Sequence, residues 1–375
     1  MRNDELWFIL IKISNEKKVN LIKKYKDEEN IRKNKRNIKE FSNIDINEVT
    51  DDKINNFKNY IKNNGIGYIT INYKEYPNDL NHVDDPPYVL FYKGNLELLK
   101  GELAAVIGAR KCTNYGAEVA KIIGRELSEN NITVVSGLAA GIDSIAHKSA
   151  INYKGKTIGV LGCGIDIVYP KNNKFLYEEI IKKDGLIISE YLPKTPPMAY
   201  NFPRRNRIIS GISKRLIIIE ATNKSGSLIT VNYALQIGRD IMAIPGPVIN
   251  GNSEGCNKLI RDGAKPFTEI EDLYDFFGIK KENVMKSDKN SYKTVLLQVI
   301  NSEPKHLDDI LTTVNVDRKV LFELLFEMQN RNEIICLPGN YYAKSIWIKG
   351  GVTPKEKWSF IYGTKSCNSG IACKG

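Results

Sequence analysis

An aromatic residue and a cluster of arginines lie within six positions near the middle of this 375-residue chain: Phe202, Arg204, Arg205 and Arg207. A guanidinium group binds a phosphate through two hydrogen bonds and also stacks on planar rings. An aromatic ring beside such groups can hold unpaired bases, and each stacked base contributes roughly 1–3 kcal/mol. We expect Phe202 in an irregular loop, followed by a helix that begins near Asn206 and directs Arg207 into a cleft. The alternative is a solvated arginine cluster with Phe202 in the core.

Two further segments place glycine and serine between a short apolar run and a helical stretch. Small residues at such a place let backbone N–H groups face outward at the start of a helix, which suits an anionic oxygen. The candidates are Ser136 and Gly137 in the first segment and Lys224, Ser225 and Gly226 in the second. The alternatives are tight turns that need glycine for their geometry, and serines that only cap a helix.

The signatures of a nucleotide cofactor are absent from these loops. Arg110 stands where G-x-G-x-x-G needs a glycine, and the run that ends at Gly137 brings no acidic residue for a ribose. No G-x-x-x-x-G-K-[ST] loop occurs, and six cysteines without a CxxC pair give no conventional metal site. No nucleophile–base pair stands out, and His147 reads as a packed side chain rather than a base. We therefore expect no cofactor, no metal and no enzyme activity.

The loops must be positioned by short apolar runs that alternate with helical stretches. Each run is β-branched or small and is continuous rather than alternating, which is typical of strands that are buried on both faces. Right-handed crossovers between such strands give an α/β, Rossmann-like, doubly wound and mostly parallel sheet, whose ligands bind at the carboxyl ends of the strands. The runs are 104–108, 133–137, 157–162, 185–189, 216–220 and 241–245.

Changes in composition, paired prolines and a polar stretch divide the chain further. Residues 1–85 are poor in glycine and predict a small helical domain of the SAM or helix-hairpin-helix kind, which ends at paired prolines. Residues 86–278 hold the Rossmann-like sheet, and 279–291 are a polar linker. The segment 292–345 predicts three helices and a hairpin, a winged-helix module whose third helix has balanced charges and so favours packing or a protein contact over duplex reading. We assign no role to the tail, 346–375.

The net charge of +11 favours polyanionic partners, although a Lys- and Asn-rich composition alone also produces it. No run of about 18 apolar residues occurs, so no membrane span is expected. The first residues lack the basic and apolar pattern of a secretion signal. We therefore expect a cytoplasmic protein.

Taken together, an ordered series of short motifs resembles the DNA-processing protein A (DprA/Smf) family. The resemblance is strong over about residues 76–275 and weaker toward both ends. The matching motifs are YP (76–77), DPP (85–87), YKGN (92–95), GAR (108–110), SGLAAGID (136–143), AH (146–147), NFPRRNRII (201–209), KSGSLIT (224–230), GR (238–239), PG (245–246) and GCNKLIRDGA (255–264).

This resemblance implies a homodimer that binds and protects single-stranded DNA and loads the RecA recombinase during natural transformation. It also implies site residues: basic contacts from Arg110, Lys171 and the Arg205 and Arg207 pair, a base-contacting Phe202, and a glycine turn at Ser136 and Gly137. Lys171 follows a proline-stiffened turn, and its alternative is a solvated lysine. Many family members carry a basic residue where this chain has Ala139 and Ala140, so one phosphate contact is expected to be missing.

Two other classes of protein stay open at this stage. The first is a nucleotide-processing hydrolase on a related Rossmann-like fold. Against it, the chain has KSGSL at 224–228 where that group needs Pro-Gly-Gly-x-Gly-Thr, and Glu220 lies on the wrong side to serve as the base. The second is a protein-interaction scaffold whose basic loops are incidental.

Overall fold

The computed structural model describes residues 2–42, 44–249, 251–279, 284–301, 303–314, 318–331 and 333–345. The chain divides into two compact units, Met1–Ile279 and Lys280–Gly375, and each is described by itself. No helix in the described part of the chain has the length and apolar character needed to cross a membrane.

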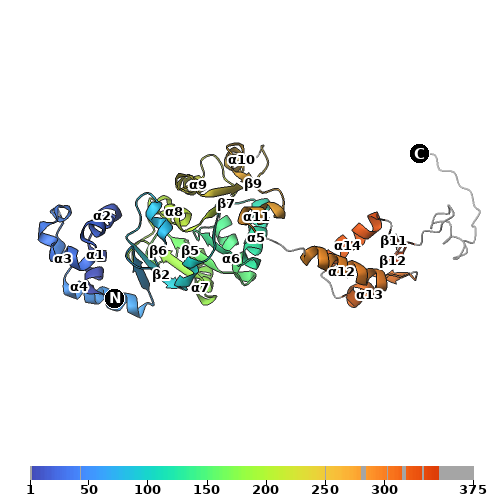
Figure 1. The fold of residues 1–375 in the computed structure, drawn as a ribbon, viewed down its shortest axis with the longest axis horizontal. Coiled ribbons are helices and arrows are strands. Elements are labelled where there is room, and N and C mark those ends of the chain that lie inside the picture. The colour runs from blue at the N-terminus through green and yellow to red at the C-terminus, as the bar shows by residue number, and fades with distance from the viewer. Residues whose placement is uncertain are drawn as a thin grey trace, which may run out of the picture. The chain divides into compact units, whose positions relative to one another are not determined.

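A nine-stranded sheet forms the centre of the first unit (Figure 1), in the order β1-β2-β6-β5-β4-β3-β7-β8-β9. The seven strands from β6 to β9 are parallel, and the order reverses around β3, because β4 and β7 lie on its two sides. The predicted doubly wound sheet is thus confirmed. The strands are β1 (Gly67–Thr70), β2 (Val89–Gly94), β3 (Leu103–Gly108), β4 (Thr133–Ser136), β5 (Thr157–Leu161), β6 (Leu186–Ser189), β7 (Arg215–Ile219), β8 (Asp240–Ala243) and β9 (Lys265–Pro266).

Strands β1 and β2 extend the sheet beyond β6 in antiparallel fashion. Residues 67–70 were expected in the N-terminal helical domain, but they pair with β2 and belong to the sheet. Tyr68 and Ile69 are buried here and make apolar contacts. The strand has only four residues, which is too short for a recognisable strand pattern in the sequence.

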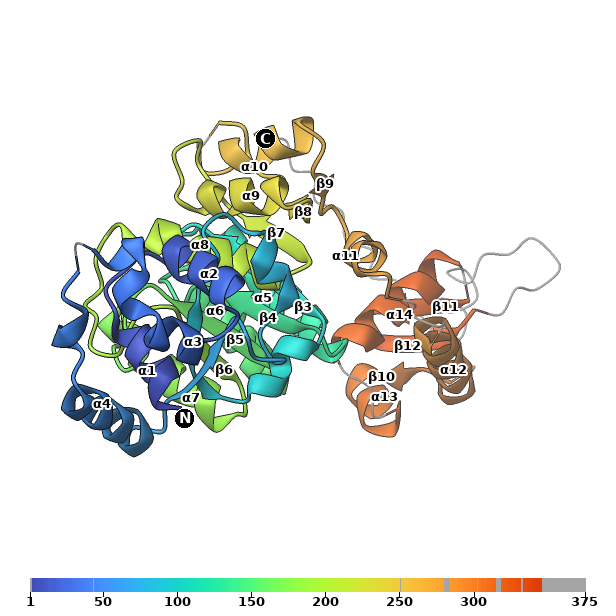
Figure 2. The same ribbon diagram turned by 60° about the vertical axis from the view of Figure 1, so that its left-hand side comes forward.

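Helices cover both faces of the sheet. At one end of the sheet, α9 and α10 lie beside β8 and β9 (Figure 2). One face packs against α5 and α6 through a cluster that includes Val106, Ile123 and Ala146. The other packs against α8 and α9 through a cluster that includes Ile107 and Ile209. The helices of this region are α5 (Asn114–Glu129), α6 (Ile142–Asn152), α7 (Lys174–Lys182), α8 (Asn201–Ile212), α9 (Ser227–Gln236), α10 (Glu254–Arg261) and α11 (Ile270–Phe277).

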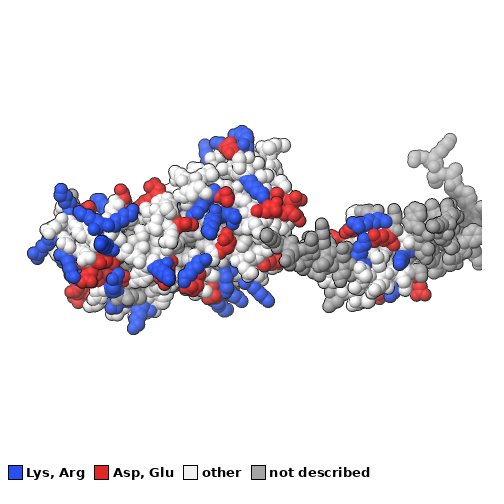
Figure 3. Space-filling model, in the orientation of Figure 1, with Lys and Arg blue, Asp and Glu red and all other residues white. Residues whose placement is uncertain are grey.

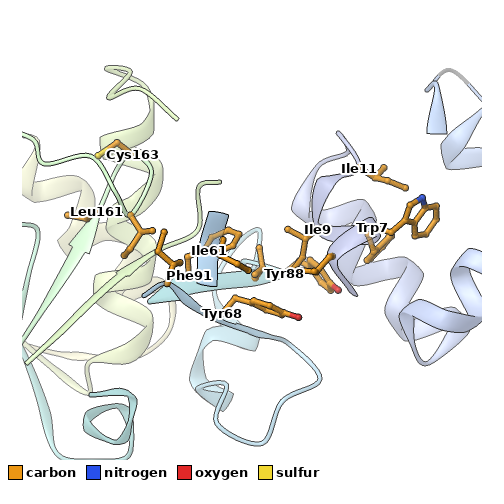
Figure 4. Packing of buried hydrophobic residues seen from close by; sticks show 14 of the residues in the cluster. Trp7, Ile9, Ile11, Ile61, Tyr68, Tyr88, Phe91, Leu161 and Cys163 are labelled. Atoms are coloured by element: carbon orange, nitrogen blue, oxygen red, sulfur yellow. The ribbon is translucent and has the colours of Figure 1, made fainter. Parts of the chain in front are cut away.

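The N-terminal helices share a core with the sheet. They are α1 (Asn3–Leu10), α2 (Asn15–Tyr25), α3 (Glu28–Lys33) and α4 (Asp51–Asn63). Figure 4 shows a run of buried side chains that leads from Trp7 and Ile11 past Tyr88 and Phe91 to Leu161. The helical segment therefore packs into the first unit. Single-turn 3₁₀ segments lie at 35–37, 39–41, 46–48, 78–82, 96–100 and 171–173.

The described residues of the second unit form three helices and a three-stranded antiparallel sheet of order β10-β12-β11. This agrees with the predicted three helices and hairpin, except that the first helix begins at Val284, inside the segment expected to be a linker. The elements are α12 (Val284–Val299), β10 (Lys305–His306), α13 (Leu307–Val314), α14 (Arg318–Asn330), β11 (Ile334–Leu337) and β12 (Tyr341–Lys344). The predicted tail, 346–375, lies outside the described residues.

His147 is a packed core side chain, as the sequence indicated. It is fully buried, and its Nδ1 lies 2.5 Å from the hydroxyl of Thr157. That hydroxyl donates to the carbonyl of Val134, so it accepts from Nδ1–H and leaves Nε2 as the unprotonated nitrogen. Nε2 has no partner among the described residues, and burial lowers the pKa of His147 to about 3.

This low pKa predicts a pH-dependent stability. An unfolded histidine takes up a proton near pH 6.5 and the folded one only near pH 3, so stability falls as the pH drops below about 6.5. The slope attributable to His147 approaches about 1.4 kcal/mol per pH unit. Urea unfolding followed by circular dichroism between pH 7 and 4.5 should show a flatter curve for His147→Gln. Parallel curves for the two proteins would contradict this account of His147.

Candidate nucleic-acid interface

A cavity of about 450 Å³ opens at the carboxyl edge of the sheet, where the strand order reverses. The loops after β3, β4 and β7 and the first turns of α8 form its walls, which is where doubly wound sheets bind ligands. It collects five of the ten predicted site residues, from three separate segments of the chain: Arg110, Phe202, Arg205, Ser225 and Gly226.

Helix α8 begins at Asn201, five residues before the predicted start. Pro203 misled the prediction, but a proline is tolerated in the first turn, where the missing N–H has no partner in the helix anyway. Phe202 is therefore fixed in the first turn rather than in an irregular loop, and its ring is half-buried.

Arg207, on the same helix, does not line the cavity. Its side chain is buried and forms a two-pronged ion pair with Glu190, at 2.9 and 2.7 Å. Its Nε also donates to the carbonyl of Asp85. The sequence predicted that Arg207 contacts a phosphate, but in the structure the guanidinium is enclosed and neutralised by the chain itself.

The neighbouring Arg204 is held in a similar way. Its guanidinium group donates to the Asp85 carboxylate at 2.6 and 3.1 Å. Asp85 therefore contacts two successive turns of α8, since its carbonyl receives Arg207. The DPP segment, which lies between β1 and β2, therefore supports the helix.

Arg205 lines the cavity but is largely buried. Its Nη1 donates to the carbonyl of Gly137 at 2.8 Å and also to that of Val160, while its Nε donates to Asn206. Burial lowers the pKa of Arg205 to about 10, and the negative charge of Asp143 opposes that shift. Arg205 thus ties α8 to the ends of β4 and β5.

The predicted anion nest in the second loop is already occupied. The N–H groups of Gly137 and Ala139 donate to the Asp143 carboxylate, and the Ser136 hydroxyl donates to the carbonyl of Val106. Burial raises the pKa of Asp143, although Arg205 and these amides favour its charged form. The prediction of free donors at Ser136 and Gly137 is wrong, because the chain supplies its own anion.

Gly137 is nevertheless required by the packing. A side-chain carbon at this position would lie 2.5 Å from a guanidinium nitrogen of Arg205 and 2.8 Å from the Asp143 carboxylate. The glycine turn therefore makes room for the charged pair beneath the cavity, rather than for a ligand.

Phe202 and Arg110 meet at the cavity. The guanidinium carbon of Arg110 lies 5.9 Å from the centre of the Phe202 ring, within the range of a cation–π contact. Phe202 also packs on the backbone of Gly162, where an added side-chain carbon would approach its ring to 2.8 Å. Arg110 is exposed at the end of β3, as the sequence predicted for a loop cation.

Loop 222–226 separates this cavity from a larger one of about 1090 Å³. Ser225, Gly226 and Ile229 line both cavities, and Lys224 lines the larger one. The Ser225 hydroxyl lies 2.7 Å from that of Ser227, and α9 starts directly after Gly226. The amino terminus of α9, which is the positive end of the helix dipole, therefore lies at the boundary between the two cavities.

Glu220, which the sequence excluded as a hydrolase base, has a structural role. It directly follows β7 with a φ of 51°, and its buried carboxylate accepts from the N–H of Thr113 at 2.8 Å and from the Thr113 hydroxyl. This contact joins the loop after β3 to the loop after the neighbouring strand β7.

The remaining cations reach solvent from loops. Arg110, Lys171 and Lys224 are exposed, and none forms an ion pair with a carboxylate in the described ranges. On the face drawn in Figure 3, lysine and arginine side chains of the first unit are interspersed with acidic ones. The net charge is therefore not gathered into a single patch on that face, and local geometry decides which cations are available to a ligand.

The sequence reading missed the acidic partners of the site. Asp85, Asp143 and Glu190 each hold or neutralise a guanidinium group at α8. Asp143 and Asp85 lay inside recognised motifs and offered a signal, whereas Glu190 had none beyond its place at the end of a strand.

These features define an α/β protein with an open cationic and aromatic cavity at the switch point of a doubly wound sheet. The chain belongs to the DNA recombination-mediator protein A family, whose sequence profile matches residues 67–278. The resemblance drawn from the sequence motifs is thereby confirmed. The family consists of recombination mediators and not enzymes, so the hydrolase alternative does not hold.

Individual relatives support the assignment. The chain is 49% identical over 199 residues to DNA processing protein DprA of Streptococcus pneumoniae, covering 53% of this chain and 70% of that protein. It is 34% identical over 277 residues to protein Smf of Escherichia coli K12, covering 71% and 74%.

Solved structures agree. The X-ray structure of DprA from Streptococcus pneumoniae superposes with a TM-score of 0.62 at 35% identity, over 73% of this chain and 98% of that one. A structure of DNA processing protein A from Helicobacter pylori, which concerns its single-stranded DNA binding mode, superposes with a TM-score of 0.51 at 32% identity, over 56% and 95%.

The buried ion pair predicts a stability defect in Arg207→Ala. Removing the guanidinium leaves the Glu190 carboxylate buried without its main partner, which costs about 3–5 kcal/mol. Arg110→Ala, at an exposed position, should change stability by no more than about 0.5 kcal/mol. Urea unfolding of both variants measures the difference, and equal small effects would show that Arg207 does not anchor α8.

Proposed function

We propose that this protein binds single-stranded DNA at the cavity between the loops after β3 and β7 and the first turn of α8. The observation that carries the proposal is the contact between Arg110 and Phe202 at this cavity. A cation and a ring in contact offer one surface for a phosphate and one for a base, and a duplex hides its base faces in the stack. The Helicobacter pylori relative, described by its single-stranded DNA binding mode, supports the same class of ligand.

The phosphate contacts are assigned to groups that face solvent. Arg110, Lys171 and Lys224 supply charge, and Ser225 and Gly226 supply polar groups at the start of α9. Arg205, Ser136 and Gly137 support the cavity from beneath, because their hydrogen-bond donors already bind acceptors of the protein itself. This assignment moves the phosphate-binding charge from α8 to the surrounding loops.

Salt-dependent binding tests the assignment. Fluorescence polarisation with a labelled oligothymidine should show tighter binding than with a duplex, and the log–log salt slope should be about −0.7 per phosphate contacted. Arg110→Ala should weaken binding about tenfold and flatten the slope by about 0.7, because one charge-assisted contact is lost. Arg110→Lys should keep the slope, and Lys183→Ala, at an exposed position near the amino end of β6, should behave as the wild type.

Phe202 should act without releasing ions. Phe202→Leu keeps an apolar contact with Gly162 but removes the ring, so binding should weaken about five- to hundredfold at an unchanged salt slope. Thermal unfolding of the same variant is the control. Loss of stability at unaltered affinity would contradict the base-contacting role of Phe202.

The family relationship extends the proposal to the cell. We infer a cytoplasmic homodimer that protects incoming single strands during natural transformation and hands them to the RecA recombinase. Binding of the DNA through its phosphates and a few stacked bases suits this task, because such contacts do not depend on a particular sequence.

This role predicts a measurable hand-over. The protein should speed RecA assembly on oligonucleotides that are already covered by a single-strand-binding protein, and Arg110→Ala should slow that assembly in proportion to its lost affinity. Light scattering at several concentrations measures the dimer independently. Full mediator activity in a variant that has lost DNA binding would contradict the link between the two.

A further inference from the structure

Tyr169 contacts Phe202, which lines the cavity, and has the more accessible ring of the two. Its ring centre lies 5.3 Å from that of Phe202, with the planes inclined by 35°. Tyr169 is 44% exposed, whereas Phe202 is half-buried. The two rings come from different segments, Tyr169 from the loop after β5 and Phe202 from α8. Their contact therefore joins this loop to the helix.

The Phe202 ring already has neighbours on several sides. The backbone of Gly162 packs closely against it, Arg110 lies 5.9 Å from its centre, and Tyr169 adjoins it. A single base stacked on Phe202 would fill much of the surface that is left. A second base in the same strand therefore needs another platform, and Tyr169 is the adjoining ring.

We propose that Tyr169 is a second stacking platform, which binds the base next to the one held at Phe202. The inference rests on the proposed binding of single-stranded DNA and deepens it, since it extends the site from one nucleotide to at least two. Proteins that bind single strands without sequence preference stack successive bases on successive aromatic rings along a basic groove.

The cations near the two rings alternate with them in a way that suits a continuous strand. Arg110 accompanies Phe202, and the exposed Lys171 follows Tyr169 by two residues. Lys171 forms no ion pair within the described part of the chain, so its charge is available to the phosphate that links the two stacked nucleotides.

A purely structural role for Tyr169 makes a different prediction. If the ring only supports Phe202, its removal should disturb binding of the first nucleotide as much as the second, and oligonucleotide length should not matter. Length dependence therefore separates the two roles, and Tyr169→Phe, which keeps the ring, separates stacking from the hydroxyl.

The experiment compares an oligothymidine of about twelve nucleotides with one of about three in which every position but one is abasic, so that the shorter strand offers a single base, in competition binding. Tyr169→Ala should weaken the longer oligonucleotide about five- to hundredfold, the effect of one lost stack, and the shorter one clearly less, at an unchanged salt slope. Tyr169→Phe should bind both as the wild type does. Tyr153→Ala is the matched control, because Tyr153 is 47% exposed and lies after α6, before β5 begins.

A base-specific probe completes the test. The fluorescence of 2-aminopurine is quenched by stacking, so one substituted position in the longer oligonucleotide should lose quenching in Tyr169→Ala and keep it in Tyr169→Phe. Unchanged binding and quenching in Tyr169→Ala would overturn this inference alone, as would an equal loss for both lengths. If the wild type bound neither oligonucleotide, the proposed function would fall, and this inference with it.

Discussion

The buried ion pair between Arg207 and Glu190 fixes the helix on which the candidate site depends. It sets the rotation of α8 about its axis, and Asp85 secures the same helix through Arg204 and through the backbone. With this rotation fixed, Phe202 in the first turn faces the cavity and Arg205 reaches beneath it to the ends of β4 and β5. A charge buried without its partner costs several kcal/mol, so the arrangement resists rotation of the helix.

The cations around the site therefore fall into two groups with different roles. Those on α8 hold the protein together, and those on the loops after β3, β5 and β7 face solvent, where a ligand can reach them. Beneath the cavity, the Asp143 carboxylate accepts hydrogen bonds from the amides of its own loop, so these donors are not free for a ligand. Solvent-exposed cations above a hydrogen-bonded floor suit a ligand that is charged, extended and variable in sequence.

Much of this could be predicted from the sequence. Continuous β-branched runs marked six of the seven inner strands, all but β2, since strands buried on both faces leave that pattern, and the glycine-bearing loops lay where they were expected. The orientation of α8 could not be predicted, because it depends on a proline in the first turn and on partners 17 and 119 residues away. The short β1 gave too little pattern, since its contacts come from β2 and from the N-terminal helices.

Photocrosslinking tests the central claim most directly. An oligonucleotide that carries 5-iodouracil crosslinks to side chains in stacking contact with its bases, and mass spectrometry of the digested protein identifies them. The account predicts crosslinks in the first turn of α8, at Phe202, and in the loop after β5, with few elsewhere. Crosslinks confined to the second unit or to the N-terminal helices would contradict it.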